Sequence, residues 1–445
     1  MKSLKVIAIA TLSCAALSGF AQNPLITSQF TADPTARVFN DKIYVYPSHD
    51  ILATKGHGRP GWFNMADYHV YSSVNLTDWT DHGVILTQQT VPWADSTSYS
   101  MWAPDCINRN GKYYLYFPTM AKGSVNGRGF TIGVATANRP EGPFNAEPEP
   151  IKGIHGIDPN VFIDKDGQAY IYYALGNIMG AKLKANMLEL DGDPVILGTF
   201  PDKGLKEGPF LFERNGIYYM TYPHVENKIE RLEYATSNSP LGPFKFAGVL
   251  MDESASGCWT NHQSVVQYKG QWYLFYHNDD LSPNFDKNRS IHADSLFFNA
   301  DGTIRKVIQT LRGVGLTRAE KEIQIDRYSD ISKTGATVDF IDTAHPMQGW
   351  KTTFSQPGAW IRYNAVVFSK KPKVLSASIM SAQGGSFEVR LDEPDGLLVG
   401  TLKSPASADW KEMKTTITKP ISGKHDLFVI AKSPDQLAID WVKFK

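Results

Sequence analysis

The chain has 445 residues, enough for two or more domains. It carries 45 Lys and Arg against 45 Asp and Glu, so its formal net charge is zero. Nucleic acids and anionic membranes both select a basic surface, so this balance argues against either partner.

The first 21 residues have the pattern of a secretory signal peptide. Lys2 and Lys5 precede an apolar run from Val6 to Phe20, and small residues allow cleavage after Ala21. The run is too short for a membrane-spanning helix and no stop-transfer charges follow it. No other segment is long and apolar enough to cross a bilayer. We therefore expect a protein that is secreted or periplasmic after cleavage.

Three cysteines raise two further questions. Cys14 lies inside the apolar run, but Thr11-Leu12-Ser13 makes a poor lipid-attachment signal before it. Cys106 and Cys258 remain in the mature chain. An oxidising compartment would allow them to pair, and the sequence leaves open whether they meet.

The next part of the chain repeats one pattern five times: a polar start, an apolar strand, a tight turn and an aromatic strand. The turns fall at Asn40-Asp41, Asn110-Gly111, Asp166-Gly167, Asn215-Gly216 and Lys269-Gly270. Asn-Gly between two hydrophobic runs is a strong hairpin signal. The spacings are 70, 56, 49 and 54 residues. A period near this length with a hairpin in each unit predicts a five-bladed β-propeller.

The repeats share a register as well as a turn. Counting back eight or nine residues from each turn reaches Asp33, Ala103, Asp158, Glu207 and His262. The innermost strand of each propeller blade runs along the central axis, so equivalent positions converge. We therefore expect the three carboxylates and the histidine around one pocket at one end of the axis.

Three carboxylates around one cavity suggest acid–base chemistry. Burial and like charge raise the pKa of at least one of them, which keeps a proton available near neutral pH. Glycoside hydrolysis needs one protonated and one ionised carboxyl. Glu207 has the longer side chain and apolar neighbours, so we assign it as general acid, with Asp33 as general base and Asp158 orienting Glu207 and raising its pKa. Each carboxylate alone is more typical of a turn, and only the shared register favours a site.

His262 would hydrogen-bond this cluster or bind a cation in the channel. The sequence has no HExxH, CxxC pair or EF-hand loop to indicate a conventional zinc or calcium site. No organic cofactor is indicated.

The C-terminal third has a different pattern. Residues 317–325 are charged and linker-like, and alternating strands fill the rest of the chain. Such strands predict a β-sandwich. The predicted organisation is an all-β protein with a signal peptide at 1–21, a propeller at 22–316 and a β-sandwich, of jelly-roll type, at 326–445.

Several stretches of residues 24–315, in order, resemble glycoside hydrolase family 43. They are "FTADPTARVF", "MWAPDC", "HGIDPNVFIDKDGQAYIYY", "LKEGPFLFERNGIYYMTYPH", "CWTNHQSVVQYKGQWYLFYHN" and "NRSIHADSLFFNADGTI". The resemblance implies a five-bladed propeller and inverting, single-displacement hydrolysis. It matches Asp33 to the family's base, Asp158 to its pKa-modulating aspartate and Glu207 to its acid.

The same resemblance implies roles for three further residues. His262 matches a histidine near an axial cation, commonly calcium. Arg289 matches an arginine that contacts the sugar, and its guanidinium fork suits two neighbouring hydroxyls. Trp102 matches a pocket-wall residue, where an indole stacks on a sugar ring, although a buried blade residue is the alternative.

Two shorter stretches indicate the branch of the family. "GWFNMADYH" (61–69) and "PSHDI" (47–51) resemble β-xylosidases and α-L-arabinofuranosidases. The two sugars present similar atoms, so the sequence does not separate them. We expect an enzyme that removes terminal β-D-xylosyl and/or α-L-arabinofuranosyl residues from xylan or arabinoxylan oligosaccharides of plants. An endo-acting arabinanase or xylanase and a non-catalytic sugar-binding propeller remain alternatives, and the intact carboxylates argue against the second.

The C-terminal strands resemble carbohydrate-binding module family 6. This implies a jelly roll, often with a structural calcium. Tyr328 and Trp410 are candidate sugar-binding aromatics, but Trp360, Trp410 and Trp441 would equally suit a core. The glutamate that commonly opens the family's first strand is not evident near Tyr328. Sugar binding and a purely structural cap on the propeller therefore both stay open.

Overall fold

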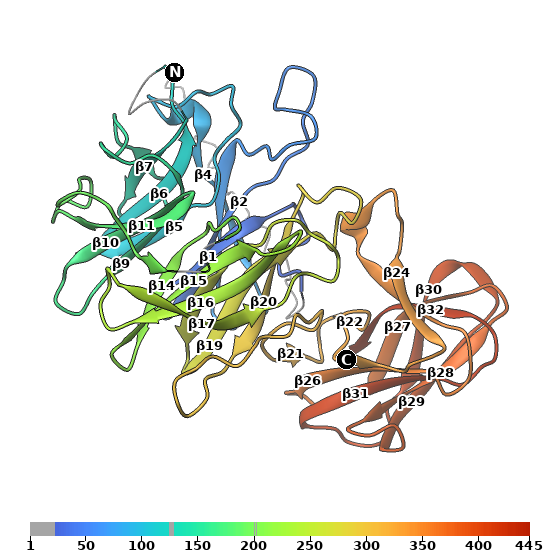
Figure 1. The fold of residues 1–445 in the computed structure, drawn as a ribbon. Helices are drawn as coiled ribbons and strands as arrows, with labels where there is room; N and C mark the ends of the chain where they lie inside the picture. Colours follow the sequence, from blue (N-terminus) through green and yellow to red (C-terminus); the bar gives the residue numbers. More distant parts are fainter. Residues whose placement is uncertain (1–22, 124–128, 200, 202) are drawn as a thin grey trace, which may run out of the picture.

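The structure is a computed structural model, and it describes residues 23–123, 129–199, 201 and 203–445. The predicted signal peptide, with Cys14, lies outside the described residues. Within them the chain forms strands and two short 3-10 turns, Gln88–Thr90 and Pro346–Gln348, and no α-helix. Figure 1 shows two units, one from the N-terminal two thirds of the chain and one from the C-terminal third.

Five sheets follow one another in the first unit. The first contains β1 (Ala32–Phe39), β2 (Lys42–Ser48), β3 (Asp67–Ser73) and β4 (Thr80–Thr87), and the second β5 (Asp105–Arg109), β6 (Lys112–Met120), β7 (Phe130–Ala137) and β8 (Asn145–Ala146). The third contains β9 (Ile157–Ile163), β10 (Ala169–Leu175), β11 (Asn177–Leu183) and β12 (Val195–Ile196). The fourth contains β13 (Gly198–Thr199), β14 (Phe210–Arg214), β15 (Ile217–Val225), β16 (Glu230–Ser237) and β17 (Phe244–Met251). The fifth contains β18 (Ser264–Tyr268), β19 (Gln271–Asn278) and β20 (Ser290–Leu296).

The innermost strands of these sheets form a closed ring. β1 contacts β5, β5 contacts β9, β9 contacts β14, β14 contacts β18, and β18 contacts β1 again. The chain before β1 completes the last sheet, because Leu25 N–H donates to the Ile291 carbonyl at 2.9 Å and Thr31 N–H to the Arg289 carbonyl at 2.8 Å. Both ends of the unit thus meet in one sheet. This is the ring of a β-propeller, with one sheet for each sequence repeat.

The repeated turns have the backbone that the sequence predicts. Residues Asn40, Asp41, Asn110, Gly111, Asn215, Gly216, Lys269 and Gly270 all have φ between 49° and 82°. Positive φ at both central residues is the type I′ hairpin geometry, which matches the twist of the flanking strands. In the third repeat only Gly167 has positive φ, at 85°, and Asp166 does not, so this hairpin uses a different turn.

The second unit is a sandwich of two six-stranded sheets. One contains β21 (Thr317–Arg318), β23 (Asp330–Ile331), β26 (Trp360–Phe368), β28 (Gly385–Leu391), β29 (Leu397–Ser404) and β31 (Gly423–Ala431). The other contains β22 (Ile323–Gln324), β24 (Ala336–Phe340), β25 (Trp350–Phe354), β27 (Val374–Ser381), β30 (Ser407–Thr416) and β32 (Leu437–Phe444). The linker-like residues 317–325 therefore contribute β21 and β22, one to each sheet.

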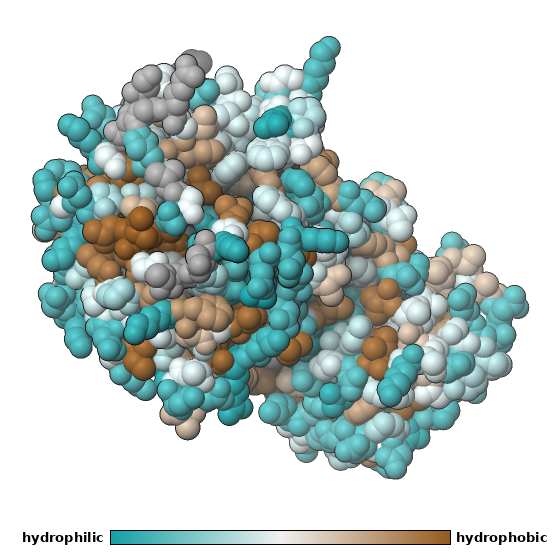
Figure 2. All heavy atoms as spheres, viewed as in Figure 1, coloured by the Kyte–Doolittle hydropathy of each residue, from teal (hydrophilic) through white to brown (hydrophobic). Residues whose placement is uncertain are grey.

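The sandwich core combines aliphatic and aromatic side chains and is closed to solvent. Inward-facing residues of both sheets, such as Ile361, Val389 and Ile439, have no exposed surface. Trp360, Trp410 and Trp441 each remain partly exposed. In Figure 2 the sandwich surface is largely hydrophilic, and the larger apolar area lies over the propeller.

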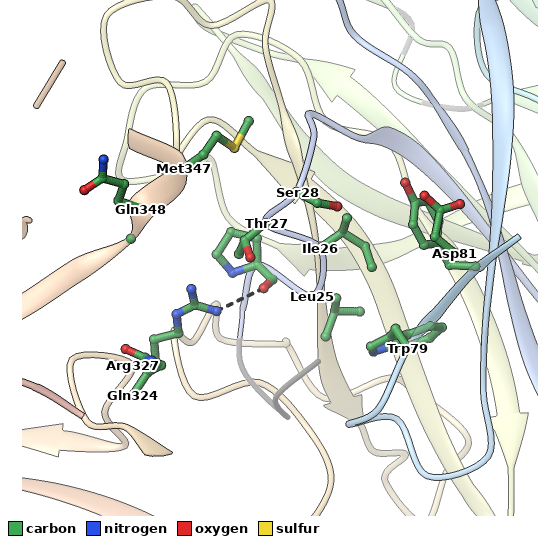
Figure 3. Close-up of a pocket in the computed structure, with 13 residues that line it drawn as sticks. Leu25, Ile26, Thr27, Ser28, Trp79, Asp81, Gln324, Arg327, Met347 and Gln348 are labelled. Atoms are coloured by element: carbon green, nitrogen blue, oxygen red, sulfur yellow. Dashed lines mark hydrogen bonds between the residues drawn. The ribbon is translucent and has the colours of Figure 1, made fainter. Parts of the chain in front are cut away.

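The two units meet around the segment that precedes β1. The Arg327 guanidinium of the sandwich donates to the Pro24 carbonyl at 3.2 Å, and a cavity of about 190 Å³ lies beside this contact (Figure 3). It is lined by Trp79 and Asp81 from the propeller and Gln324 and Met347 from the sandwich, among others. Within the described residues, none of the predicted site residues lines it.

Two smaller points concern the cysteines and membranes. Cys106 and Cys258 are both buried and unpaired, so the pairing left open by the sequence does not occur. In the described part of the chain, no helix has the length and apolarity needed to cross a membrane.

Candidate active site

The predicted site residues lie around one cavity of about 120 Å³. Asp33 is the second residue of β1 and Asp158 the second of β9, while Glu207 and His262 lie just before β14 and β18. All four line this cavity, and so do Trp102 and Arg289. The convergence inferred from the repeat register is therefore present in the structure.

The two aspartates share an unusual backbone. Asp33 has φ of 47° and Asp158 has φ of 58°, and in both pairs of strands the register shifts beside them. A proline follows each one, at Pro34 and Pro159, and proline cannot donate to the strand ladder. A bulge at such a point re-aims a side chain. The Asp-Pro dipeptide thus turns each carboxylate out of its strand and into the cavity.

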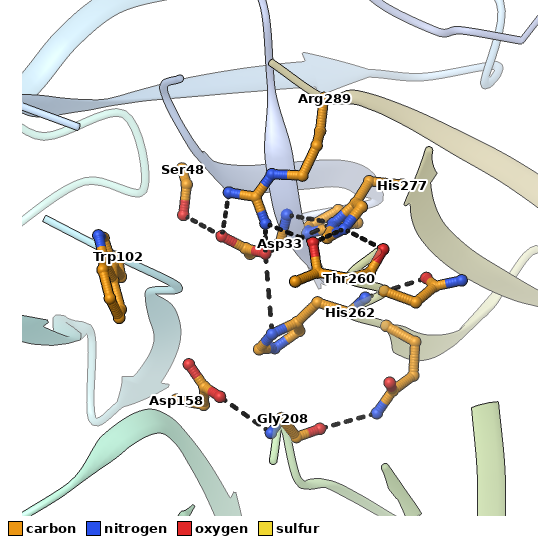
Figure 4. Close-up of polar contacts among 12 residues, drawn as sticks. Asp33, Ser48, Trp102, Asp158, Gly208, Thr260, His262, His277 and Arg289 are labelled. Atoms are coloured by element: carbon orange, nitrogen blue, oxygen red, sulfur yellow. Dashed lines mark hydrogen bonds and ion pairs between the residues drawn. The ribbon is translucent and has the colours of Figure 1, made fainter. Parts of the chain in front are cut away.

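Asp33 is held as a carboxylate. Ser48 Oγ donates to its Oδ2 at 2.6 Å, and Arg289 Nη1 donates to its Oδ1 at 3.0 Å (Figure 4). Its side chain is almost fully buried, and burial alone would raise its pKa. The charge of Arg289 first, then the neighbouring His277 and His262 and the Ser48 hydrogen bond, outweigh burial and lower the pKa of Asp33 to about 2. Asp33 is therefore ionised throughout the neutral range.

Asp158 has the opposite character. Its Oδ2 accepts from the Gly208 N–H at 2.9 Å (Figure 4), next to Glu207 in the chain. Burial raises its pKa to about 7, against the effect of His262 and with help from the carboxylates of Glu207 and Asp33. Asp158 is thus mostly protonated at weakly acidic pH.

Glu207 is partly exposed to the cavity, which leaves its carboxyl accessible to a ligand. Burial raises its pKa, and Asp33 adds to this, while Glu230 and Arg289 oppose it. A raised pKa keeps the proton that an acid must deliver. The sequence interpretation expected Asp158 to raise this pKa. In the structure Asp158 contacts the backbone beside Glu207, and the like charges of the two carboxyls raise the pKa of Asp158 as well.

Glu230 is a site residue that the register of the repeats did not predict. It is the first residue of β16, has no exposed surface and contacts the Glu207 carboxyl. β16 is the third strand of its sheet when counted from the axis, and the count back from each turn reaches only the innermost strand.

Arg289 lines the cavity, but its guanidinium group is already engaged. Nε and Nη2 donate to the two oxygens of Asp50 at 2.9 Å, and Nη1 donates to Asp33 at 3.0 Å and to Thr260 Oγ1 at 3.3 Å. The fork that was expected to bind two sugar hydroxyls therefore holds two buried carboxylates. Asp50, which the sequence interpretation did not single out, is fully buried, and burial outweighs Arg289 to raise its pKa.

His277 is a third residue that the sequence did not predict. It is buried, and burial and the Arg289 charge lower its pKa well below the usual value, so it is neutral. Its Nδ1 accepts from the Asp33 backbone N–H at 3.0 Å. This contact fixes the backbone that carries Asp33.

Aromatic side chains form the apolar wall of the cavity. Trp102 packs against Phe130 with ring centroids 4.4 Å apart and keeps some exposed surface. Trp62, Phe63 and Trp259 line the same cavity. Trp102 is therefore a wall residue with exposed surface rather than a fully buried blade residue.

His262 offers limited support for a calcium ion. Its Nδ1 lies 3.9 Å from Asp33 Oδ1. Gln263, whose Nε2 donates to the Gly208 carbonyl, has a buried Oε1 without a hydrogen-bond partner in the described residues. Calcium takes six to eight oxygen ligands. One imidazole and one such oxygen fit a cation only if water supplies most of its ligands.

One group of three metal-binding side chains occurs in the described ranges, away from the residues that line this cavity. His49, Asp67 and His69 place one ligand atom each within 4.8 Å of one another. His49 Nδ1 and Asp67 Oδ1 are 2.7 Å apart, so these residues already satisfy one another.

The site joins an ionised carboxylate to two carboxyls of raised pKa in an aromatic-walled cavity at one end of a ring of sheets. An ionised and a protonated carboxyl facing one cavity are the functional groups of a glycosidase, so the class that the fold and site define is a β-propeller glycosidase. Comparison with known families agrees. The chain belongs to the glycosyl hydrolases family 43, which residues 21–304 match, and residues 330–445 match the carbohydrate binding module (family 6).

Individual relatives give the same result. The xylosidase/arabinosidase 43A of Humicola insolens is 35% identical over 333 residues, covering 63% of this chain and 98% of the relative. The arabinoxylan arabinofuranohydrolase of Bacillus subtilis (strain 168) is 29% identical over 473 residues, covering 92% of this chain and 88% of the relative. A solved family 43 β-xylosidase/α-arabinofuranosidase from a compost microbial metagenome, in complex with xylotriose and in a calcium-free form, has a TM-score of 0.59. It is 35% identical and covers 65% of this chain and 98% of its own.

These comparisons confirm the predicted family, the all-β class with a propeller followed by a sandwich, and glycosidase activity.

Proposed function

We propose that this protein removes terminal β-D-xylosyl and/or α-L-arabinofuranosyl residues from hemicellulose oligosaccharides by inverting hydrolysis. Glu207 protonates the glycosidic oxygen as the bond from C1 to that oxygen breaks. A water molecule attacks C1 from the other face, and Asp33 takes its proton. Asp158 holds the backbone beside Glu207 through Gly208.

The observation that carries this proposal is that two carboxyls of one cavity have pKa values shifted in opposite directions. Arg289 above all lowers the pKa of Asp33, as a base needs, while burial raises the pKa of Glu207, as an acid needs. General acid–base catalysis needs both states at one pH. Neither residue has to exchange its state before substrate arrives.

The substrate class follows from the relatives and the cavity. The relatives above are a xylosidase/arabinosidase, an arabinoxylan arabinofuranohydrolase and a β-xylosidase/α-arabinofuranosidase. A cavity of about 120 Å³ is smaller than the pockets that hold drug-sized ligands, and suits one sugar ring. This favours release of single terminal sugars over an endo-acting groove.

Two measurements test this proposal. A panel of aryl β-xyloside, aryl α-arabinofuranoside, linear arabinan and arabinoxylan should give monosaccharide as the first product from at least one of the first two and from arabinoxylan. Proton NMR of the first product should show inverted anomeric configuration. Oligosaccharides as first products would support the endo-acting alternative, and retained configuration would exclude Asp33 as a base that activates water.

We also propose that a largely hydrated calcium ion binds near His262. The support is the imidazole and the unpartnered Gln263 oxygen described above. Calcium should then raise the thermal unfolding temperature of the metal-stripped protein, and His262→Ala should abolish that rise. An unchanged rise in His262→Ala would place any calcium elsewhere, for example in the sandwich.

Secretion or periplasmic export is a proposal that rests on residues 1–21 alone. Expression of the full chain with fractionation, followed by N-terminal sequencing, should find a mature protein that begins at Gln22. An uncleaved protein in the cytoplasm would contradict it.

A further inference from the structure

Glu230 lies beside the proposed general acid. Glu207 N–H donates to the Pro223 carbonyl on β15 at 3.4 Å, and Val225 of β15 pairs with Glu230 of β16. The backbone thus brings the two glutamates to the same corner of their sheet, where their carboxyls interact with each other.

The remaining contacts of Glu230 fix its orientation. Its Oε2 accepts from the Asn261 N–H at 2.5 Å, and its own N–H donates to the Trp259 carbonyl at 3.0 Å. Trp259 and Asn261 both line the cavity. Its Oε1 is buried and has no hydrogen-bond partner in the described residues, so this oxygen can carry a proton toward the neighbouring Glu207 carboxyl.

Glu230 is a neutral donor in this arrangement. Burial, together with the nearby Glu207 carboxyl, raises its pKa well above the usual value. A protonated carboxyl has one O–H to donate. Because Asn261 N–H already approaches Oε2, the proton is left for the side of Glu230 that faces Glu207.

We propose that Glu230 is a positioning residue for Glu207, to which it donates a hydrogen bond as Glu207 becomes a carboxylate. This inference rests on the proposed role of Glu207 as the acid. When Glu207 gives its proton to the glycosidic oxygen, negative charge develops on its carboxyl, and Glu230 donates to that charge without losing its own proton. The proton taken by Asp33 from water later returns to Glu207 through solvent, so the cycle closes with Glu230 unchanged.

Charge-assisted hydrogen bonds are stronger than neutral ones. The contact therefore favours the transition state over the ground state, and its loss lowers turnover more than binding. The effect should appear only where the leaving group needs a proton. The dinitrophenolate of a dinitrophenyl glycoside departs without a proton. The alcohol of a methyl glycoside or of a disaccharide departs only if the glycosidic oxygen is protonated.

The experiment compares Glu230→Leu and Glu230→Gln with the parent on both kinds of glycoside. Glu230→Leu removes the donor, and kcat for the disaccharide should fall about 10- to 100-fold, the range expected for a hydrogen bond to a charged group. Its kcat for the dinitrophenyl glycoside should change less than threefold. The amide of Glu230→Gln can donate to Glu207 while its oxygen accepts from Asn261, so this variant should recover most of the loss.

A matched control is Glu233→Gln. Glu233 is buried three residues further along β16, where its Oε1 contacts His224 and Arg231 instead of the cavity. The Glu233→Gln variant should have a lower unfolding temperature, but the ratio of its kcat values on the two substrates should match that of the parent. If Glu230→Leu does not fold, Glu230→Met, closer in shape to glutamate, takes its place.

The outcomes separate this inference from the proposed function. If Glu207→Ala fails to show a larger loss on the disaccharide than on the dinitrophenyl glycoside, the acid assignment itself is wrong. If Glu207→Ala shows that difference and the Glu230 variants lose both activities equally, or lose neither, only the inference about Glu230 is overturned.

Discussion

Asp33 and Asp158 occupy the same place in two blades and yet differ in protonation. Each is the second residue of an innermost strand, precedes a proline, has positive φ and is 5% exposed. The pKa of Asp33 is lowered to about 2 and that of Asp158 is raised to about 7. Equivalent backbone positions therefore place the two carboxyls, but they do not decide their charge.

The difference comes from residues outside the repeat. Arg289 precedes β20 and reaches Asp33, while the described contacts of Asp158 include no arginine or lysine. The Arg289 guanidinium lies between the buried carboxylates of Asp33 and Asp50 and forms an ion pair with each of them. The repeat thus supplies the geometry of the site, and the segments between strands supply its electrostatics.

The largest expected effect comes from removing the ionised member of the pair. Asp33→Asn should lower kcat/KM about 10²- to 10⁴-fold, the usual contribution of a general base, because the amide cannot accept a proton from water. Steady-state kinetics on an aryl glycoside measures this. Added azide should restore activity by attacking C1 in place of activated water. Near-parental activity without azide would show that another group is the base.

Removal of the cation that distinguishes the two aspartates should come next. Arg289→Met leaves Asp33 and Asp50 buried without their partner, and breaking such a pair costs about 3–5 kcal/mol of unfolding free energy. The pKa of Asp33 should rise, so the acid limb of kcat/KM should move to higher pH. Urea unfolding and a pH–rate profile measure the two effects.

The matched control for this substitution is Arg37→Met. Arg37 pairs with the buried Asp105 at 2.6 Å, outside the residues that line the cavity. It should destabilise the protein and leave the acid limb in place. If the acid limb of kcat/KM shifts equally in both variants, the shift comes from loosened packing and not from the lost charge beside Asp33.

The same substitution at the protonated member should have a smaller effect. In Asp158→Asn the amide oxygen can still accept from Gly208 N–H, and the amide has the neutral charge that burial already imposes on Asp158. We expect about a tenfold loss of kcat, roughly the value of one weakened hydrogen bond. A loss as large as that of Asp33→Asn would show that the working enzyme needs Asp158 ionised.

The sequence was sufficient for the part of the site that repeats. The turns set the register, the register placed Asp33, Asp158, Glu207 and His262, and all four line one cavity. Trp102 and Arg289 came from the family resemblance and also line it. The repeat period predicted these positions because each repeat forms one sheet and the sheets are arranged around one axis. Equivalent residues of successive repeats therefore face the same axis.

Residues outside the period escaped the same reasoning. Glu230 begins a strand two positions further from the axis, and nothing in "VENKIERLEY" indicates that its side chain turns inward. Asp50 and His277 lie at strand ends whose path depends on how neighbouring sheets pack. An acidic residue directly after an aromatic strand, as in "YVYPSHD", is the one local signal that could have indicated Asp50. Residues 317–325 were predicted to be a linker because their two strands have only two residues each, too few to show the alternating pattern of a strand.

The smallest effect is on the pH dependence of stability, and it has opposite signs for the two aspartates. Asp33 has a folded pKa below its unfolded value of 3.8, so it stabilises the protein above that value and loses this stabilisation as pH falls toward 2. Asp158 has a folded pKa of about 7, so the native state holds a proton that the unfolded chain releases. Asp158 therefore makes stability fall as pH rises from about 4 to 7, by at most about 1.4 kcal/mol for each pH unit.

Urea unfolding of the parent and Asp158→Asn at several pH values across this range isolates that contribution. The variant should lose less stability between pH 4 and 7 than the parent, because asparagine does not titrate. Asp33→Asn should leave this slope unchanged and alter only the region below about pH 4. Parallel curves for the parent and Asp158→Asn would mean that Asp158 is ionised in the native state, which would remove the contrast between the two blades.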